Sequence, residues 1–402
     1  MQDDITEGIR ILNQLAKKLK QRRLDNGALT LASPEVRFSL ERDTQDPVDV
    51  EMKELKETNA LVEEFMLLAN ISVARKIYEK FPDSAMLRCH PSPPATSFEK
   101  LEKAVARMGI TIDHSTSKAL SESLDNAVIP GEPYFNKLLR ILTTRYMMQA
   151  VYFCSGSMTK QEFRHYGLAT DFYTHFTSPI RRYSDVMVHR QLQATIDSDV
   201  SYGKELTDKE AMNELCGVLN HRNRMAQQAA RSSVELFTHL FFKNKVEEEE
   251  GYVIRILKNA FIVLVPKYGI EGIVYASAKA HKSTDGTSSS TILVYNPETD
   301  SLQSTEPLSE GQIPKIQIQL FQKVMVQISI DDDLKGGGEG GMRQKLKMAL
   351  LKPWIEGISV HGISNKNNPE AHAFISTVND GAVKRREGSG EETKRGGKRS
   401  KV

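Results

Sequence analysis

Long apolar runs are missing from the sequence, and cysteine and tryptophan are scarce. No stretch reaches the roughly 18 consecutive apolar residues that a membrane-spanning helix requires. The chain has 3 cysteines and 1 tryptophan, and the cysteines are too far apart for a paired metal-binding motif. We therefore expect free thiols in a reducing compartment, no structural zinc and no membrane partner.

Net charge is also small, and no leader segment is visible. The 54 Lys and Arg residues nearly balance the 52 Asp and Glu residues, which leaves a formal charge of +2. Any affinity for nucleic acid must therefore come from local clusters of charge. The first dozen residues contain Asp3, Asp4 and Glu7 and lack an apolar core, so we expect an intracellular protein without a signal or transit peptide.

Hydrophobic periodicity predicts a helix-rich first half of the chain. With 402 residues, the chain is long enough for two or three domains. The first helix is rich in Lys and Arg and has no preceding element to pack on, so we expect that a part upstream is missing. Residues 28–52 are expected to form strands or a hairpin, and residues 88–94 a surface connection. Helices are predicted over residues 5–24, 58–81, 97–108, 135–152 and about 208–242.

A change of character near residue 245 predicts a second, smaller domain made of strands. Short β-rich runs separated by turns indicate a small barrel, with long loops at 281–291 and 331–341. The runs lie at 251–256, 260–265, 272–275, 321–330 and 343–351. We expect domains over residues 1–244 and 245–355, followed by a disordered basic tail over 356–402.

The most informative stretch is YTHFTSPIRRYSDVMVHR, residues 173–190. It has the pattern of a helix start, in which Thr177 or Ser178 caps the helix and Pro179 occupies the first helical position. The free N–H groups of a first turn bind anions, and guanidinium groups hold phosphate oxygens in pairs. Arg181 and Arg182 are therefore candidates for a phosphate clamp.

The spacing within this stretch suggests further roles. Arg181, Asp185 and His189 recur every four residues, so on one helix face Asp185 could orient Arg181. Tyr173 and Phe176 could stack on bases. The alternatives are a salt-bridged helix face and, less favoured because a third ligand is absent, a metal pair formed by Asp185 and His189.

Two adjacent carboxylates and a group of strand aromatics are further candidates. Glu63 and Glu64 lie in a helix that is apolar nearly all round, so one is expected to face a polar site; a structural salt bridge is the alternative. In the barrel, aromatic residues alternate with basic ones, as in domains that bind single strands; core packing is the alternative. These residues are Tyr252, Phe261 and Tyr268, together with Arg255, Lys258 and Lys267.

Two motifs carry a resemblance to a known family. LVEEFMLLANIS at 61–72 and HFTSPIRRYSDVMVHR at 175–190 resemble the RNB catalytic domain of RNase II-type exoribonucleases. Residues 27–31, 148–155 and 266–272 resemble most the branch that is the catalytic subunit of the eukaryotic RNA exosome. The resemblance extends from residue 1 to about 353 and implies an α+β fold: the helix-rich C-terminal part of an RNB domain, followed by an OB-type β-barrel.

The resemblance also implies an activity, a cofactor and partners. The family hydrolyses single-stranded RNA from its three-prime end to nucleoside monophosphates with Mg²⁺, and the exosome branch acts with exosome core subunits in RNA processing and decay. By resemblance, Arg181 matches the arginine at the scissile phosphate, and Glu63 or Glu64 a glutamate near the terminal nucleotide. The side chains expected to contact RNA are Arg181, Arg182, Tyr173, His175, Ser178, Asp185, His189, Tyr252, Phe261, Lys267 and Tyr268.

The sequence departs from the family at the metal site. The family's four-aspartate motif lies upstream of every matched segment, and neither Asp3 and Asp4 nor Asp331–Asp333 has its context. No metal ligand is therefore assigned here. We expect a fragment, truncated isoform or partial gene model that binds RNA and hardly cuts it. The alternative is a non-catalytic RNA-binding or scaffold fragment; a purely structural helical protein is disfavoured because it leaves the paired arginines unexplained.

Basic clusters near the C-terminus suggest a location. Residues 384–386 and 394–401 are spaced like a two-part nuclear import signal, although a solvated basic tail is the alternative. The expected location is nuclear, with the cytoplasm as a second compartment.

Overall fold

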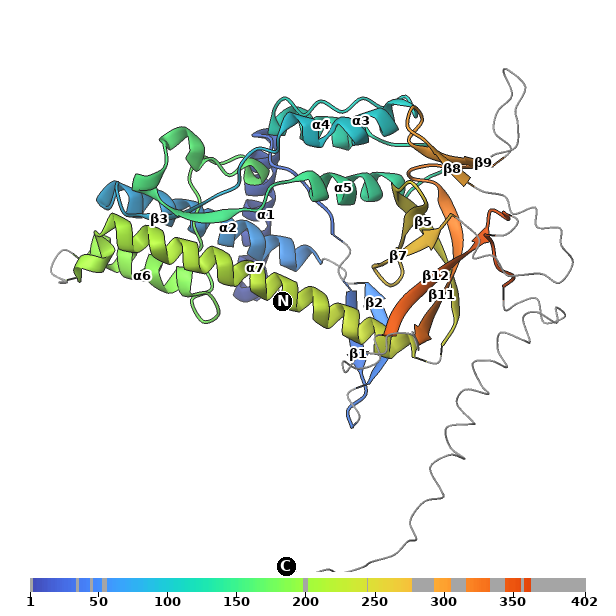
Figure 1. The fold of residues 1–402 in the computed structure, drawn as a ribbon. Coiled ribbons are helices and arrows are strands. Elements are labelled where there is room, and N and C mark those ends of the chain that lie inside the picture. Colours follow the sequence, from blue (N-terminus) through green and yellow to red (C-terminus); the bar gives the residue numbers. More distant parts are fainter. Residues whose placement is uncertain are drawn as a thin grey trace, which may run out of the picture. The chain divides into compact units, whose positions relative to one another are not determined.

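The computed structural model divides the chain into two compact units (Figure 1). The first unit runs to Phe241 and also includes Pro266–Ile270, and the second comprises the remaining residues from Phe242 onward. The division lies three residues before the domain boundary expected after residue 244. The structure describes residues 3–33, 36–43, 46–52, 56–197, 202–243, 245–276, 293–304, 316–332, 344–355 and 358–362.

Helices make up most of the first unit. They are α1 (Asp4–Asp25), α2 (Glu57–Lys80), α3 (Glu99–Ala106), α4 (Ser117–Asn126), α5 (Phe135–Tyr146), α6 (Tyr183–Ile196) and α7 (Lys209–Phe242), which ends at the division (Figure 1). Short 3-10 helices are η1 (Ala95–Ser97), η2 (Ser155–Ser157), η3 (Lys160–Phe163), η4 (Tyr166–Leu168) and η5 (Lys204–Leu206). Across the described ranges, no helix is both long and apolar enough to cross a membrane.

Two antiparallel strand pairs complete the first unit. The hairpin of β1 (Val36–Leu40) and β2 (Pro47–Met52) confirms the strands expected within residues 28–52. The second pair joins β3 (Met86–Cys89) to β4 (Val151–Cys154), two segments that are far apart in the sequence. The surface connection predicted over residues 88–94 is wrong at its start, where Arg88 and Cys89 belong to β3 and Cys89 and His90 are buried. Residues 91–94 are irregular and mostly exposed, as predicted.

The periodic helices are confirmed, with one correction. α1, α2 and α7 begin and end within about one residue of the predicted bounds. The helix predicted over residues 135–152 ends at Tyr146, because Val151, Tyr152 and Phe153 belong to β4. β-branched and aromatic residues favour strands, and here they have a partner in β3.

The core of the first unit lies beneath the segment that carries the arginines. It combines α2, the β3 and β4 pair, α6 and the start of α7. Ile77, Met86, Leu87 and Val188 are each no more than 1% exposed. Burying a side chain of this size stabilises the fold by about 1.5–3 kcal/mol. The site described below therefore rests on a packed support.

The second unit is built from antiparallel strands. Its five-stranded sheet has the order β12, β11, β5, β6, β7. These strands are β5 (Glu247–Ile256), β6 (Ala260–Val265), β7 (Ile270–Tyr275), β11 (Lys323–Asp332) and β12 (Gln344–Lys352). A three-stranded sheet of β8 (Leu293–Asn296), β9 (Ser301–Ser304) and β10 (Gln317–Ile318) was not predicted.

The two edges of the five-stranded sheet approach each other. Gly272 lies on β7 and Met348 on β12, and a Cβ atom added to Gly272 would collide with the Met348 side chain. The sheet therefore curls into a nearly closed barrel, and a side chain at Gly272 would require the flexible Met348 side chain to move. The loop expected over 281–291, most of the loop over 331–341 and most of the tail expected over 356–402 lie outside the described residues. The start of that tail is ordered, contrary to the prediction: residues 358–362 are described, and the Val360 N–H donates to the Leu350 carbonyl of β12 at 2.8 Å.

Candidate RNA phosphate site

A surface turn carries the first of the paired arginines, and helix α6 begins only after it. The backbone carbonyl of Ser178 accepts N–H bonds from Arg181 at 3.2 Å and Arg182 at 3.1 Å, so Pro179 opens a turn. The helix starts at Tyr183 with Arg182 as its N-cap. The predicted caps, Thr177 and Ser178, are therefore wrong by four or five residues.

The buried carboxylate of Asp185 fixes the conformation of this turn through hydrogen bonds. Its side chain is 0% exposed and accepts two hydrogen bonds from the Arg182 guanidinium, at 2.6 and 2.8 Å. It also accepts the Ser178 N–H at 2.7 Å. The expectation that Asp185 orients Arg181 is wrong: Arg181 precedes the helix, so the four-residue spacing does not place it on the same face.

Arg181 is the more accessible of the two arginines. Its Nη2 donates to the Ser178 hydroxyl at 3.3 Å, and no carboxylate in the described part of the chain pairs with it. The neighbouring Ile180 is 97% exposed, which places the turn at the surface. Arg181 can therefore offer its N–H groups to an external anion while Arg182 is held in place.

In this structure His189 contacts Phe176 through both its ring and its Nε2 atom. The two rings are stacked with centroids 4.2 Å apart, and His189 Nε2 lies 2.9 Å from the Phe176 carbonyl oxygen. One face of Phe176 is therefore covered. As for a metal pair with Asp185, the described residues contain no group of three His, Cys, Asp or Glu side chains that could hold a metal ion.

Tyr173 and His175 lie beneath the turn. Tyr173 is 6% exposed, and its hydroxyl accepts a hydrogen bond from the Asn70 amide at 3.1 Å. A base cannot stack on a ring that is buried in this way, so in this conformation Tyr173 supports the site from inside. His175 Nδ1 lies 2.5 Å from the hydroxyl of Tyr152.

The positive charges of three arginines act on the His175 ring. Burial lowers the pKa of His175 to about 2, with further lowering by Arg88, Arg182 and Arg181. The imidazole is therefore neutral at physiological pH. Burial also lowers the pKa of Arg88, which sequence reasoning missed because it placed residues 88–94 in a surface loop.

The two candidate carboxylates of α2 have different environments. Glu64 is 4% exposed and forms an ion pair with Arg23 of α1, with Oε1 and Nη2 separated by 2.5 Å. Glu63 is exposed. The salt-bridge alternative therefore describes Glu64 in this structure, and the roles of both residues toward RNA stay predictions.

Among the residues predicted on the barrel, some are buried in the core and others keep exposed surface. Phe261 is 0% exposed and Tyr268 is 4% exposed, so core packing describes both. Lys267 is exposed, with its Nζ 5.0 Å from the centre of the Tyr268 ring, and Tyr252 is half-buried. Of these residues, Lys267 and Tyr252 keep surface that could meet a ligand.

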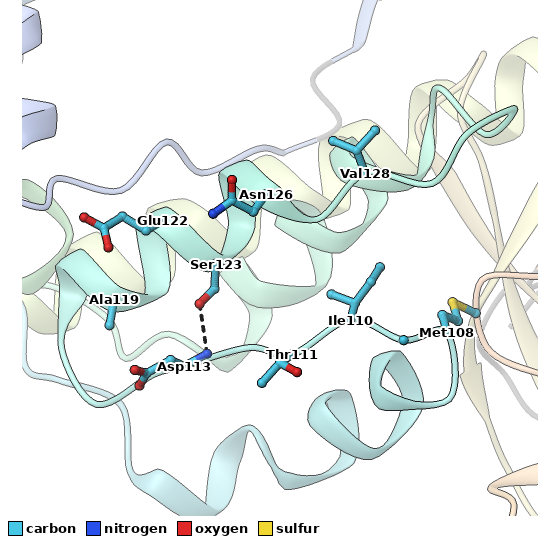
Figure 2. Close-up of a pocket in the computed structure, with 10 residues that line it drawn as sticks. Met108, Ile110, Thr111, Asp113, Ala119, Glu122, Ser123, Asn126 and Val128 are labelled. Atoms are coloured by element: carbon cyan, nitrogen blue, oxygen red, sulfur yellow. Dashed lines mark hydrogen bonds between the residues drawn. The ribbon is translucent and has the colours of Figure 1, made fainter.

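A cavity of about 500 Å³ lies in another part of the first unit (Figure 2). Its lining comes from α4, the segment that precedes it and Val128 just after it, and includes the carboxylates of Asp113 and Glu122. The Asp113 N–H donates to the Ser123 hydroxyl at 3.0 Å. Two carboxylates without a basic residue in the lining disfavour a phosphate, so this cavity does not extend the arginine site.

Comparisons with known proteins give a family for each unit. The RNB domain family matches residues 1–198, and the S1 domain family matches residues 247–342. The S1 domain has an OB-type fold, which confirms the fold class predicted for the second unit together with the barrel-like sheet.

Several relatives are similar over most of this chain. The exosome complex exonuclease RRP44 of Homo sapiens is 49% identical over 361 residues, 90% of this chain and 35% of the human protein. The exosome complex exonuclease dis3 of Schizosaccharomyces pombe is 48% identical over 355 residues, 87% of this chain and 35% of the yeast protein. The chain therefore spans about a third of the length of these curated relatives.

Solved structures share the fold at low sequence identity. RNase R of Mycoplasma genitalium in complex with ribose-methylated single-stranded RNA gives a TM-score of 0.67 at 18% identity, covering 81% of this chain and 48% of that one. Yeast Ssd1, described as a pseudonuclease, gives a TM-score of 0.64 at 18% identity, covering 88% of this chain and 51% of that one. With these matches, the chain belongs to the RNB family, as an RNB domain segment followed by an S1 domain.

Proposed function

We propose that this chain is the RNA-gripping part of a three-prime-to-five-prime exoribonuclease that acts on single-stranded RNA. The observation that carries the proposal is the surface turn before α6. There Arg181 has no carboxylate partner among the described residues, while Arg182 is fixed by the buried carboxylate of Asp185.

The turn suits a phosphodiester because its parts are already in position. Arg182 loses little freedom when a ligand arrives, since Asp185 already holds its fork at two points. Arg181 can then complete a bidentate contact with phosphate oxygens. Hydrogen bonds to a charged group contribute roughly 1.5–3 kcal/mol each, enough to set the position of one nucleotide along the strand.

Assembly with exosome core subunits is part of the proposal. It is supported by the two relatives described above, whose names place them in the exosome complex and which are nearly half identical to this chain. The proposed substrates are RNAs in processing and decay. A nuclear location, with the cytoplasm as a second compartment, is proposed from the basic clusters of residues 384–386 and 394–401.

Exoribonucleases of the RNB family generally use a divalent metal, and we propose Mg²⁺ for this protein. Two-metal hydrolysis requires carboxylates that hold two ions about 3.5–4 Å apart. Among the described residues no group of three possible ligands is brought together, so the side chains described here do not fit the metals. We therefore assign RNA binding to this chain and derive no hydrolytic step from it.

A non-catalytic RNA-binding or scaffold role is the second candidate. The missing ligand group among the described residues favours it, and a fold of this kind occurs in yeast Ssd1, described as a pseudonuclease. The two candidates share the arginine turn and differ in whether the bound RNA is then cleaved.

One experiment separates them. A fluorescent single-stranded oligoadenylate is titrated with the full chain in EDTA, and its length is then followed in Mg²⁺. We expect binding in EDTA, a loss of affinity of roughly tenfold for Arg181→Ala, and no loss for Arg75→Ala, which removes an exposed arginine of α2. Wild-type affinity of Arg181→Ala would overturn the proposed RNA site. EDTA-sensitive shortening from the three-prime end would instead show that this chain is a complete exonuclease.

A further inference from the structure

Arg88 is placed beside the arginine turn by strand pairing. Residues Arg88 of β3 and Tyr152 of β4 are direct partners in the antiparallel pair, so their side chains share one face. The Arg88 guanidinium lies over the Tyr152 ring, 4.6 Å from its centre. The Arg88 N–H donates to the Tyr173 carbonyl at 2.8 Å, which ties the strand to the segment that leads into the turn.

A short chain of polar contacts connects this position to Arg182. The Tyr152 hydroxyl lies 3.0 Å from the Ser184 hydroxyl, which is itself 3.0 Å from a carboxylate oxygen of Asp185. Asp185 then holds the Arg182 guanidinium at 2.6 Å. Ser184 is 2% exposed and Asp185 is buried, so this connection is a fixed part of the interior.

Positive charge exceeds negative charge in this cluster. Arg88, Arg181 and Arg182 contribute three guanidinium groups, and Asp185 contributes one carboxylate. Within the described ranges, Arg88 has no side-chain hydrogen bond and no ion pair. Its contact with the Tyr152 ring offsets only part of the cost of taking the charge out of water.

The positive charges of all three arginines also affect His175. Burial, Arg88, Arg182 and Arg181, in that order, lower the pKa of this ring. His175 is joined to Tyr152, on which Arg88 rests. An anion bound beside these groups would meet three cations and one carboxylate that is already engaged.

We propose that Arg88 binds a phosphate group of the RNA, completing a site in which Arg181 and Arg182 are the other two donors. This inference rests on the proposed function, because it assigns the ligand to the same strand that the turn would hold. In this proposal Arg88 contributes from β3, and Arg181 contributes from the exposed turn before α6. The sugar and base carry no part of this recognition, so the site is independent of sequence.

A purely structural role for Arg88 predicts a different effect of its replacement on stability and RNA affinity. If the guanidinium only packs on Tyr152, its removal lowers stability and leaves the RNA affinity of the folded chain unchanged. Arg88→Met keeps most of the stem volume and removes the charge, and Arg88→Lys keeps the charge without the fork. Arg164→Met is the matched control, because Arg164 is exposed and pairs with exposed Asp171 at 3.1 Å.

The test measures oligoadenylate binding by the full chain in EDTA at several salt concentrations. Arg88→Met should bind at least about tenfold more weakly, with a slope of log affinity against log salt that is smaller by about 0.7. Arg88→Lys should keep most of the slope and lose a few-fold in affinity, and Arg164→Met should match wild type. Wild-type affinity and slope in both Arg88 variants would overturn the inference. Should Arg88→Met fail to fold, Arg88→Lys with wild-type affinity is the overturning result.

A second measurement separates this inference from the proposed function. Inorganic phosphate is added to the wild-type chain and to Arg88→Lys while the ring signals of His175 are followed by NMR. A bound anion offsets the guanidinium field, so the His175 signals should shift in wild type at lower phosphate concentration than in the variant. If wild type fails to bind RNA but shows this difference, the proposed function fails and the anion site stands. If the two proteins respond alike, Arg88 is no part of an anion site.

Discussion

Glu64 of α2 and Arg23 of α1 form a buried ion pair that joins the first two helices of the chain. Their side chains are 4% and 16% exposed, and a second contact links Arg23 Nε to Glu64 Oε2 at 3.3 Å. A buried carboxylate of this kind is costly to leave alone. The pair therefore accounts for an acidic residue on the packed side of an apolar helix.

Removal of one partner of this pair should lower stability sharply. We expect Glu64→Gln to lower the free energy of unfolding by about 3 kcal/mol, because the Arg23 charge stays buried without its partner. Chemical unfolding of the full chain, followed by circular dichroism, measures this change. Glu63→Gln is the control: Glu63 is exposed, and its replacement should stay within about 0.5 kcal/mol of wild type. Equal effects for the two substitutions would contradict the assignment.

Asp185 should matter for both stability and RNA binding. Asp185→Asn leaves the half-buried Arg182 without its anion, so we expect a loss of about 3 kcal/mol in the free energy of unfolding. RNA affinity should fall as well, because Arg182 is no longer held. Asp171→Asn breaks an exposed pair with Arg164 and should change stability by less than about 1 kcal/mol. An Asp185→Asn protein with wild-type stability would show that the carboxylate does not organise the turn.

Stability should fall as the pH is lowered below about 6.5, the ordinary pKa of histidine. Burial and neighbouring positive groups lower the pKa of His165 to about 3 and that of His175 to about 2. Between pH 6.5 and these values the unfolded chain binds more protons than the folded one, so acid favours unfolding. The stabilisation is complete above pH 6.5 and is lost progressively toward pH 3.

The measurement is the free energy of unfolding against pH for wild type and His165→Phe. Each depressed histidine contributes a slope of up to about 1.4 kcal/mol per pH unit in this range. The variant should therefore show a smaller slope between pH 6 and pH 4, by roughly one proton. An unchanged slope would mean that His165 titrates alike in the folded and unfolded chains.

Gly27, which follows α1, should be intolerant of any side chain. Its φ is +93°, and a Cβ atom would lie 2.7 Å from the backbone Cα of Lys118. Gly27→Ala should cost more than the roughly 1 kcal/mol expected for unfavourable φ alone. Gly109→Ala tests that strain separately, because Gly109 has a φ of +75° with open space around it. Gly8→Ala, inside α1 with open space, should stabilise by up to about 1 kcal/mol. Thermal unfolding of the three variants ranks them.

The basic tail should act as a nuclear import signal. A reporter fused to residues 379–402 is expected to accumulate in the nucleus. Replacement of residues 384–386 by alanine should abolish this nuclear accumulation. The same reporter with the tail residues in scrambled order controls for charge alone. A cytoplasmic wild-type fusion would contradict the proposed location.

Much of the fold was predictable where the signal is local. α1, α2 and α7 have apolar residues at helical spacing, and these helices lie where that spacing indicated. The strands β5 and β6 were likewise visible as short apolar runs between turns. β3 was not, because its partner in β4 is distant in the sequence, and four residues carry too little pattern by themselves.

The site was predictable only in part, for a related reason. The sequence indicated that the paired arginines form a phosphate-binding motif. It did not indicate that Asp185 pairs with Arg182, because this pairing depends on a turn at Ser178 and Pro179, after which the helix begins only at Tyr183. Two helix starts were compatible with the same residues. Arg88 could not be found at all, because its neighbours come from segments that only the folded chain brings together.

The pairing of Arg88 with Tyr152 also bears on how two very short strands find their alignment. A shift of one residue would turn Arg88 to the opposite side of the pair, where Leu87 and Phe153 now sit in hydrocarbon. A bare guanidinium there would be prohibitively unfavourable, so mispaired arrangements are rejected during folding. The residue proposed to hold the ligand thus also enforces the strand register on which its own position depends.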